Sequence, residues 1–190
     1  MIRNIILDVG GILFDDSKSN IEKVLNKNCD SIYKVSYGGT FRECLLGNIT
    51  VQEHISNLVG STDFEDIKYI LSKENLSVTY PLVSENFEYI IELKKQGYRL
   101  YLLTNITEDT YQYVDSIMHI DSIFDGGIYS YQEHMIKPNS NIYELIIERF
   151  DLNKEETIFF DDREKNVIAA QAVGINAVVF RTINDIKNNI

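Results

Sequence analysis

Residues 2–11 of the chain read IRNIILDVGG, and this stretch decides how the rest of the sequence is interpreted. The run is apolar and rich in β-branched residues, and it ends abruptly in Asp8 followed by Gly10 and Gly11. An apolar run closed by an acid and a glycine turn predicts a short buried strand. In open α/β sheets, ligands bind beyond the carboxyl ends of the strands, so Asp8 is the first candidate for a functional residue.

Further apolar strands alternate with amphipathic helices along the second half of the chain. Strands are predicted at residues 98–104, 124–130, 157–160 and 175–181. Helices are predicted at residues 86–96, 108–118, 141–150 and 164–173. Pro138 is predicted to lie in the first turn of the helix at 141–150 and to mark its beginning. This alternation is typical of a parallel sheet with helices on both faces, so we predict an α/β, Rossmann-like fold.

The pattern changes between the first strand and Pro81. Residues 17–80 contain helical pieces such as IEKVLNK, VQEHISNLV and FEDIKYILSK, but no convincing strand. We interpret this region as a helical insertion placed after the first strand. Residues 1–16 and 82–190 are therefore predicted to form an α/β core domain, and residues 17–81 a small inserted helical cap.

The composition excludes several classes of protein. The chain has 190 residues and a formal charge of −11, without a run of Lys or Arg, so we expect no nucleic-acid binding. No stretch approaches the roughly 20 apolar residues that a bilayer span needs, so we expect no membrane partner. Two cysteines without metal-type spacing predict reduced thiols in a cytoplasmic protein. We expect a monomer or a weak homo-oligomer.

Polar residues follow the predicted strands of the core. The strands and the loop after the third strand deliver Asp8, Thr104, Asn105, Lys137, Asp161 and Asp162. Taken one at a time, each has an ordinary structural explanation, such as a turn acid, a helix cap or a solvated lysine. Together they converge on one edge of one sheet, which favours a functional site.

The chemistry of this set points to phosphate. Clustered carboxylates repel one another unless a cation lies between them, and a hard cation such as Mg²⁺ suits oxygen ligands. His54, His119 and His134 are scattered and are expected on the surface or in loops, so no Zn²⁺ site is predicted. A carboxylate facing the phosphorus would act as a nucleophile and form an aspartyl phosphate.

Four ordered motifs resemble those of the haloacid dehalogenase-like hydrolases. They are DVGGIL (8–13), LLTN (102–105), KP (137–138) and FFDD (159–162) followed by Asn166. The helical insertion falls where the cap of the first subclass of that superfamily would lie. Within it, FRECLLGNITVQEHI (41–55) resembles the small sugar-phosphate branch, which includes glucose-1-phosphate phosphatase-like proteins.

The resemblance implies a set of metal ligands. Asp8 and the backbone carbonyl of Gly10 would bind Mg²⁺. Asp162 would bind it directly, Asp161 directly or through a water molecule, and Asn166 would orient this shell.

The resemblance also implies how the phosphoryl group is handled. Asp8 would be the nucleophile, and Lys137 would neutralise both the nucleophile and the phosphate. Thr104 would hydrogen-bond the phosphoryl group, helped by Asn105. We therefore predict an enzyme, a Mg²⁺-dependent phosphatase that hydrolyses a sugar phosphate or another small phosphorylated metabolite.

Two positions depart from the common pattern of that superfamily. Its phosphatases usually carry a second acid two residues after the nucleophile, where this chain has Gly10. Either Asp15, Asp16 or a water molecule replaces that acid, or the leaving group departs without help. His134 stands where the commoner loop has glycine, and it is expected to reshape the loop.

Three alternatives stay open at this point. A receiver domain of a two-component system uses similar residues, but their order along the chain differs. A metal-free haloacid dehalogenase would use the same nucleophile, whereas the Asp161-Asp162 pair favours a cation. A catalytically weak protein of the same fold would bind a phosphorylated metabolite without rapid turnover. Tyr37, Phe41 and Arg42 are candidates for selecting the substrate.

Overall fold

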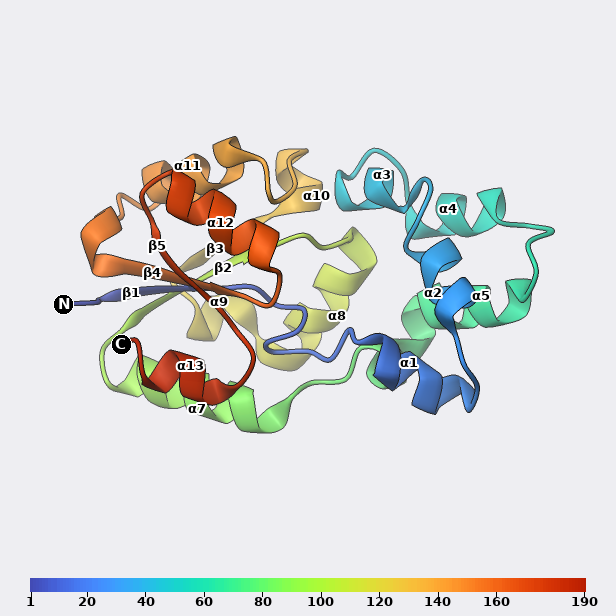
Figure 1. Ribbon diagram of the computed structural model, residues 1–190, viewed down its shortest axis with the longest axis horizontal. Helices are drawn as coiled ribbons and strands as arrows, with labels where there is room; N and C mark the ends of the chain where they lie inside the picture. Colours follow the sequence, from blue (N-terminus) through green and yellow to red (C-terminus); the bar gives the residue numbers. More distant parts are fainter.

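A parallel five-stranded sheet forms the centre of the molecule in the computed structural model, which describes residues 1–190 (Figure 1). The strand order is β3-β2-β1-β4-β5, and every neighbouring pair is parallel. The strands are β1 (Asn4–Leu7), β2 (Arg99–Thr104), β3 (Gly126–Tyr129), β4 (Thr157–Asp161) and β5 (Asn176–Val179). The predicted α/β, Rossmann-like fold is thus confirmed.

Helices cover both faces of the sheet, because successive strand side chains point to opposite faces. Ile5 and Leu7 pack into the hydrophobic cluster shared with α7 (Ser84–Lys95), α8 (Glu108–Met118), α9 (Ile120–Ile123) and α13 (Ile183–Lys187). Ile6 packs into the opposite cluster with α11 (Ser140–Arg149) and α12 (Glu164–Ala172). Each layer therefore has its own apolar core against one sheet face.

Six helices lie together beyond the carboxyl ends of the strands (Figure 1). They are α1 (Lys18–Leu25), α2 (Asp30–Ser36), α3 (Phe41–Leu45), α4 (Val51–Asn57), α5 (Phe64–Leu71) and α6 (Leu76–Thr79), with a 3₁₀ turn at η1 (Lys73–Asn75). A third hydrophobic cluster lies among them and is separate from the two sheet clusters. We refer to α1–α6 as the helical layer. The predicted boundaries of core and cap stay a prediction.

Two chain segments, residues 13–15 and residues 81–83, join the helical layer to the sheet. They run antiparallel and are joined by two hydrogen bonds: the Asp15 N–H donates to the Pro81 carbonyl over 2.9 Å, and the Val83 N–H donates to the Leu13 carbonyl over 2.8 Å. A second contact lies at α10 (Ser130–Glu133), where the Ser130 hydroxyl donates to the Leu45 carbonyl of α3 over 2.6 Å. The layer is therefore attached to the sheet on two sides of the strand ends.

Two local predictions are wrong. Pro138 does not open α11, because Asn139 caps this helix by accepting the Asn141 N–H over 3.0 Å, and the helix begins at Ser140.

His54 is not a surface residue but is fully buried in α4. Its ring nitrogens bond the Thr40 hydroxyl and the Ser36 carbonyl, each over 2.8 Å, which satisfies both polar atoms.

The remaining elements are short, and η2 (Lys154–Glu156) leads into β4. None of the helices combines the length and the hydrophobicity that a bilayer crossing requires.

Candidate active site

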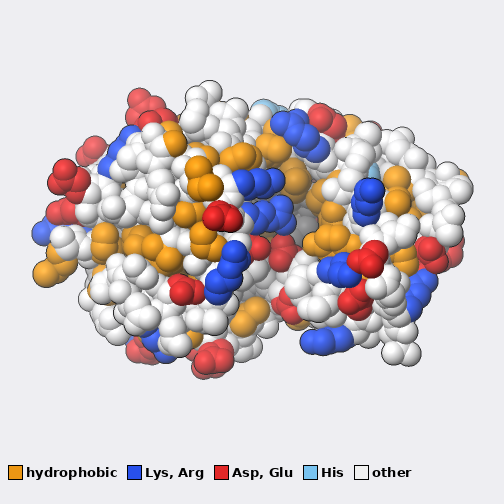
Figure 2. All heavy atoms as spheres, viewed as in Figure 1, with side chains coloured by type: hydrophobic (Ala, Val, Ile, Leu, Met, Phe, Trp, Pro, Cys, Tyr) orange, Lys and Arg blue, Asp and Glu red, His pale blue; other side chains and the backbone are white.

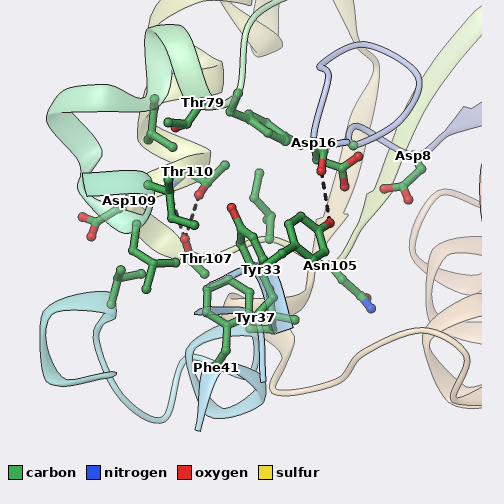
Figure 3. A pocket seen from close by; sticks show the side chains of 18 of the residues that line it. Asp8, Asp16, Tyr33, Tyr37, Phe41, Thr79, Asn105, Thr107, Asp109 and Thr110 are labelled. Carbon is green, nitrogen blue, oxygen red and sulfur yellow. Dashed lines mark hydrogen bonds between the residues drawn. The ribbon is translucent and has the colours of Figure 1, made fainter. Parts of the chain in front are cut away.

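The predicted polar residues meet at the carboxyl edge of the sheet, beside a cavity of about 360 Å³ under the helical layer. Asp8 follows β1 directly, and Asp161 is the last residue of β4. Lys137 lies in the loop between α10 and α11. Figure 2 shows the molecule hollowed between its two parts, with acidic and basic side chains along the hollow. Asp8 lies at one end of the cavity in the close view (Figure 3).

The Lys137 ammonium joins the two strand-end carboxylates. Its Nζ lies 2.9 Å from Oδ2 of Asp8 and 2.6 Å from Oδ2 of Asp161. It also donates to the Leu103 carbonyl of β2 over 2.7 Å. The Lys137 side chain is fully buried, so these three acceptors replace the water that the ammonium loses. The predicted convergence of Asp8, Lys137 and Asp161 is present in the structure.

Asp161 is held from a second side as well. Its Oδ1 accepts the Arg163 N–H over 2.8 Å, and both carboxylate oxygens accept Nδ2 of Asn166 over 3.0 Å. Burial alone would raise the pKa of Asp161, but the Lys137 ammonium outweighs it and holds that pKa below its usual value. Asp161 is therefore an ionised, fixed anchor, and Asn166 orients it as the resemblance implied.

Asn105 holds the Lys137 loop in place. Its Oδ1 accepts the Lys137 N–H over 2.8 Å, and its Nδ2 donates to the Lys137 carbonyl over 3.0 Å. This positioning contact was not predicted from the sequence, where Asn105 was expected to contact phosphate. Thr104, one residue earlier, is buried at the end of β2 and does not line the cavity. Its contact with phosphate stays a prediction.

Three carboxylates form a group with the dimensions of a metal site. One oxygen from each of Asp8, Asp161 and Asp162 lies within 4.8 Å of the others. Burial raises the pKa of Asp8, Lys137 opposes this, and the charge of Asp161 raises it further. Burial and Asp161 also raise the pKa of Asp162. Lys137 and Arg163 are the cations beside these three acids, with Nε of Arg163 4.0 Å from Oδ1 of Asp162. At least one negative charge stays unbalanced, so these residues fit a divalent cation.

The glycine pair after Asp8 allows two other acids to approach. Gly11 has φ of 72°, and a Cβ there would lie 2.7 Å from Cγ of Asp162. Gly10 has no positive φ, but a Cβ there would lie only 2.8 Å from Oδ2 of Asp16. The Asp16 carboxylate thus fills the space beside position 10 from which the side chain is missing.

Asp16 lines the same cavity as Asp8 (Figure 3). Its Oδ2 lies 3.7 Å from Nη2 of Arg163. Burial raises the pKa of Asp16 to about 6, with Asp162 adding to the rise and Arg163 opposing it. A carboxyl group that titrates near neutral pH is suited to giving and taking protons. The sequence named Asp16 only as one of several replacements, and Arg163 was missed although it directly follows the acidic pair.

The candidates for substrate selection divide into two sets. Tyr37 and Phe41 line the cavity, whereas Arg42 does not. The Arg42 side chain is exposed and lies 3.9 Å from Glu43 of its own helix.

His134 lies outside the cavity, with φ of 51°, a conformation in which glycine is common. Its Nδ1 bonds the Leu46 carbonyl of the helical layer over 2.7 Å. In place of the glycine of the commoner loop, this chain therefore has a residue that links the loop to the helical layer.

The four strand-end motifs and their geometry agree with a comparison against protein families. The sequence pattern of the haloacid dehalogenase-like hydrolases matches residues 2–174. The chain belongs to this family. The resemblance stated from the motifs is thus confirmed over nearly the whole chain.

Two curated relatives are named as phosphatases. The sesquiterpene phosphatase astK of Aspergillus oryzae is 42% identical over 84 residues, which cover 44% of this chain and 43% of that protein. The chain thus spans less than half of that relative. A D-ribitol-5-phosphate phosphatase of Bacteroides thetaiotaomicron is 24% identical over 92% of this chain and 89% of its own length.

A solved structure shares the fold over almost the whole chain. It is a haloacid dehalogenase family enzyme of Bacteroides thetaiotaomicron in complex with magnesium and inorganic phosphate, with a TM-score of 0.73. The two chains are 22% identical, and each is covered to 95%.

Replacing Lys137 by Met tests the buried ion network. Without divalent cations we expect Lys137→Met to lower the free energy of unfolding by about 3–5 kcal/mol at pH 7.5, because two buried carboxylates lose the ammonium that pairs with them. Their folded-state pKa values then rise above those of the unfolded chain, so the folded variant binds more protons. The variant should therefore recover part of its stability as the pH falls to 5. Urea unfolding at both pH values measures this.

Lys154→Met is the matched control, because Lys154 pairs with Glu144 over 2.9 Å at the surface. We expect it to cost below about 1 kcal/mol, with little change between the two pH values. If Lys137→Met lowers the free energy of unfolding relative to the wild type by the same amount at pH 7.5 and pH 5, this account of the network is contradicted.

Proposed function

We propose that the chain is a Mg²⁺-dependent phosphatase that hydrolyses the phosphate ester of a small molecule through an aspartyl phosphate on Asp8. One observation carries the proposal. Asp8 faces the cavity while its Oδ2 is held 2.9 Å from the buried Lys137 ammonium, among carboxylates whose charge one ammonium does not balance. Such a site suits a ligand that arrives with phosphoryl oxygens and a cation.

The reaction proceeds in two displacements. An oxygen of Asp8 attacks the phosphorus, and the bond between phosphorus and the ester oxygen breaks to release the alcohol. Water then attacks the phosphorus of the aspartyl phosphate, the bond between phosphorus and the Asp8 oxygen breaks, and inorganic phosphate and the free Asp8 carboxylate are released. Lys137 balances charge on Asp8 and on the phosphoryl oxygens, and the Thr104 hydroxyl donates to one of them. The Lys137 contact fixes the Asp8 carboxylate for attack.

Asp8, Asp162 and the Gly10 carbonyl would hold Mg²⁺, with Asp161 beside them bound directly or through water. The bound ion supplies positive charge that stabilises the phosphoryl oxygens.

Asp16 supplies the acid that position 10 lacks. It protonates the leaving alcohol oxygen in the first step and takes the proton of the attacking water in the second. Support comes from its position, because Oδ2 lies 2.8 Å from the point where a Cβ of residue 10 would stand. Its approach depends on Gly10, because any Cβ at that position would press against the carboxylate.

The curated relatives support phosphate more than any particular alcohol. They include a sesquiterpene phosphatase, a D-ribitol-5-phosphate phosphatase and a phosphorylated carbohydrates phosphatase. A dehalogenase is the rival reaction, and solved dehalogenases share the fold at 16–18% identity. The unbalanced acidic charge around Asp8 favours phosphate with a cation over a halogenated acid.

The nucleophile is tested by Asp8→Asn. We expect hydrolysis of phenyl phosphate to fall by roughly a thousandfold or more, because an amide does not form the acyl phosphate. Asp15→Asn is the matched control from the same segment, since its Oδ1 can still accept the Ser17 N–H. Initial rates of phosphate release measure both, and urea unfolding reports whether each variant folds. A folded Asp8→Asn protein that keeps a tenth of the activity would falsify the mechanism.

The cation is tested without activity. Mg²⁺ at a hundred times its Kd should stabilise the fold by about 2.7 kcal/mol. At roughly 2–4 °C per kcal/mol for a chain of this size, Tm should rise by about 5–10 °C. Asp162→Asn should remove most of this shift, and Asp15→Asn should keep it. Thermal unfolding across a Mg²⁺ series measures the effect, and a wild-type Tm that stays constant argues against the site.

The role of Asp16 is tested by the leaving group. Asp16→Asn should slow hydrolysis of ethyl phosphate by about 10²–10⁴, since an alkoxide needs a proton to depart. Hydrolysis of 4-nitrophenyl phosphate should slow far less, because nitrophenolate departs without one. Steady-state rates on both esters measure the ratio, with Asp15→Asn as the control.

Moving the acid completes the test of Asp16. The double variant Gly10→Asp with Asp16→Gly places a carboxylate in the same space from the other side. We expect it to recover part of the ethyl phosphate activity. Equal losses on both esters in Asp16→Asn would instead indicate that Asp16 only supports the local structure.

A further inference from the structure

The cavity extends well past the phosphate end. Its volume of about 360 Å³ equals roughly a dozen water molecules at about 30 Å³ each. Asp8 and Asp16 lie at the catalytic end, and Asp109 lies at the opposite end in the close view (Figure 3). Lys137 and Arg163 pair with Asp8 and Asp16, so they lie at the catalytic end as well. The space between them has to receive the alcohol part of the substrate.

Aromatic and aliphatic side chains form the walls of this space. Tyr33, Tyr37 and Phe41 stand beside one another, with ring centroids 4.6 and 5.1 Å apart along the series (Figure 3). Aliphatic walls come from α3 to α6, at Leu45, Val51, Ile70, Leu71 and Leu76. Four of these five, all but Leu45, are buried, so the wall is a fixed apolar surface.

Four of the hydroxyls in this space already have partners. The Thr107 and Thr110 hydroxyls lie 2.9 Å apart and bond each other. The Thr79 hydroxyl donates to the Asn75 carbonyl over 3.1 Å. The Tyr33 hydroxyl donates to the backbone carbonyl of Asp16 over 3.2 Å.

The hydroxyls of Tyr37 and Tyr80 make no hydrogen bond within the chain, and they are too few to serve a polyol. A polyol would bring several hydroxyls that stay unpaired, which is unfavourable in a closed site.

The charges along the cavity exclude a second anionic group. Lys137 and Arg163 are its only cationic lining residues, and both lie at the catalytic end. The only charged side chain at the far end is the carboxylate of Asp109. A substrate with phosphate or carboxylate at both ends would meet repulsion there.

We propose that the substrate is the phosphate monoester of an apolar alcohol, with a carbon skeleton that fills the space between Phe41 and Leu76. This inference rests on the proposed phosphatase function and differs from the sugar phosphate that the sequence suggested as one possible substrate. The phosphate occupies the end at Asp8, and the hydrocarbon displaces water from the aromatic and aliphatic walls. Burial of the hydrocarbon supplies the binding energy.

A homologous series of primary phosphates tests the proposal. Ethyl, butyl, hexyl and octyl phosphate share the same leaving-group chemistry and differ only in apolar length. We expect kcat/KM to rise by about three- to fourfold for each methylene that the cavity buries, and by roughly a hundredfold or more from ethyl to octyl. Glucose 6-phosphate, also a primary ester, should rank below butyl phosphate. Initial rates of phosphate release measure the series.

Neighbouring leucines give a matched pair of variants. Leu45 lines the cavity and Leu46 does not, and both are half-buried. Leu45→Asn should flatten the dependence of kcat/KM on chain length. Leu46→Asn should keep the wild-type series. Urea unfolding shows whether either variant has lost its fold.

The outcomes separate this proposal from the phosphatase function itself. The protein could hydrolyse phenyl phosphate while kcat/KM varies less than threefold from ethyl to octyl phosphate. This result would overturn the apolar substrate and leave the phosphatase function standing. A higher rate on glucose 6-phosphate than on octyl phosphate does the same. If no ester is hydrolysed, the function fails, and calorimetric binding of octyl and ethyl phosphate to the Asp8→Asn protein still decides. Equal affinity for the two overturns the proposal, and much tighter octyl binding supports it.

Discussion

The buried ammonium of Lys137 is the interaction on which the rest of the site depends. It has three acceptors, Asp8 after β1, Leu103 in β2 and Asp161 at the end of β4. A buried charge is unfavourable unless its partners are well placed, so this contact requires the three strands to end at matching heights. The register provides this, because Leu7 pairs with both Leu102 and Phe160. Packing of the sheet and charge in the site are therefore satisfied by one geometry.

The same contact leaves a charge imbalance that shapes everything around it. One ammonium balances one of the three clustered carboxylates, and Asp16 brings a further acid to the cavity. Two glycines after the nucleophile make this crowding possible, since a Cβ at Gly10 or Gly11 would meet Asp16 or Asp162. Glycine at positions 10 and 11 thus leaves room for the carboxylates of Asp16 and Asp162. A divalent cation relieves such repulsion, and it also balances the negative charge that a phosphoryl group brings.

The sequence predicted the sheet and the longer helices, because strands and helices of that length carry clear periodicity. Within the helical layer, α2, α3 and α6 were not identified, since elements of four to seven residues make at most two turns and show little periodicity. The strand-end residues were found because topology alone brings them together. Asp16 was no more than one option, because the antiparallel path of residues 13–15 against 81–83 brings it to Gly10. The pairing of the Asn105 amide with the Lys137 backbone could not be predicted, because only the loop geometry reveals it, and the expected contact of Asn105 with phosphate stays a prediction.

Specificity and stability are coupled in the helical layer. Val51, Ile70 and Leu71 belong to its hydrophobic cluster and also line the cavity. A substitution that reshapes the cavity therefore alters the packing that holds α2, α4 and α5 together. No such coupling applies to Asp8 and Lys137, because they are anchored on the sheet and its loops. Under the proposed function, a change of alcohol would therefore require compensating changes among the apolar residues of the layer, whereas the phosphate end, held by Lys137, would stay unchanged.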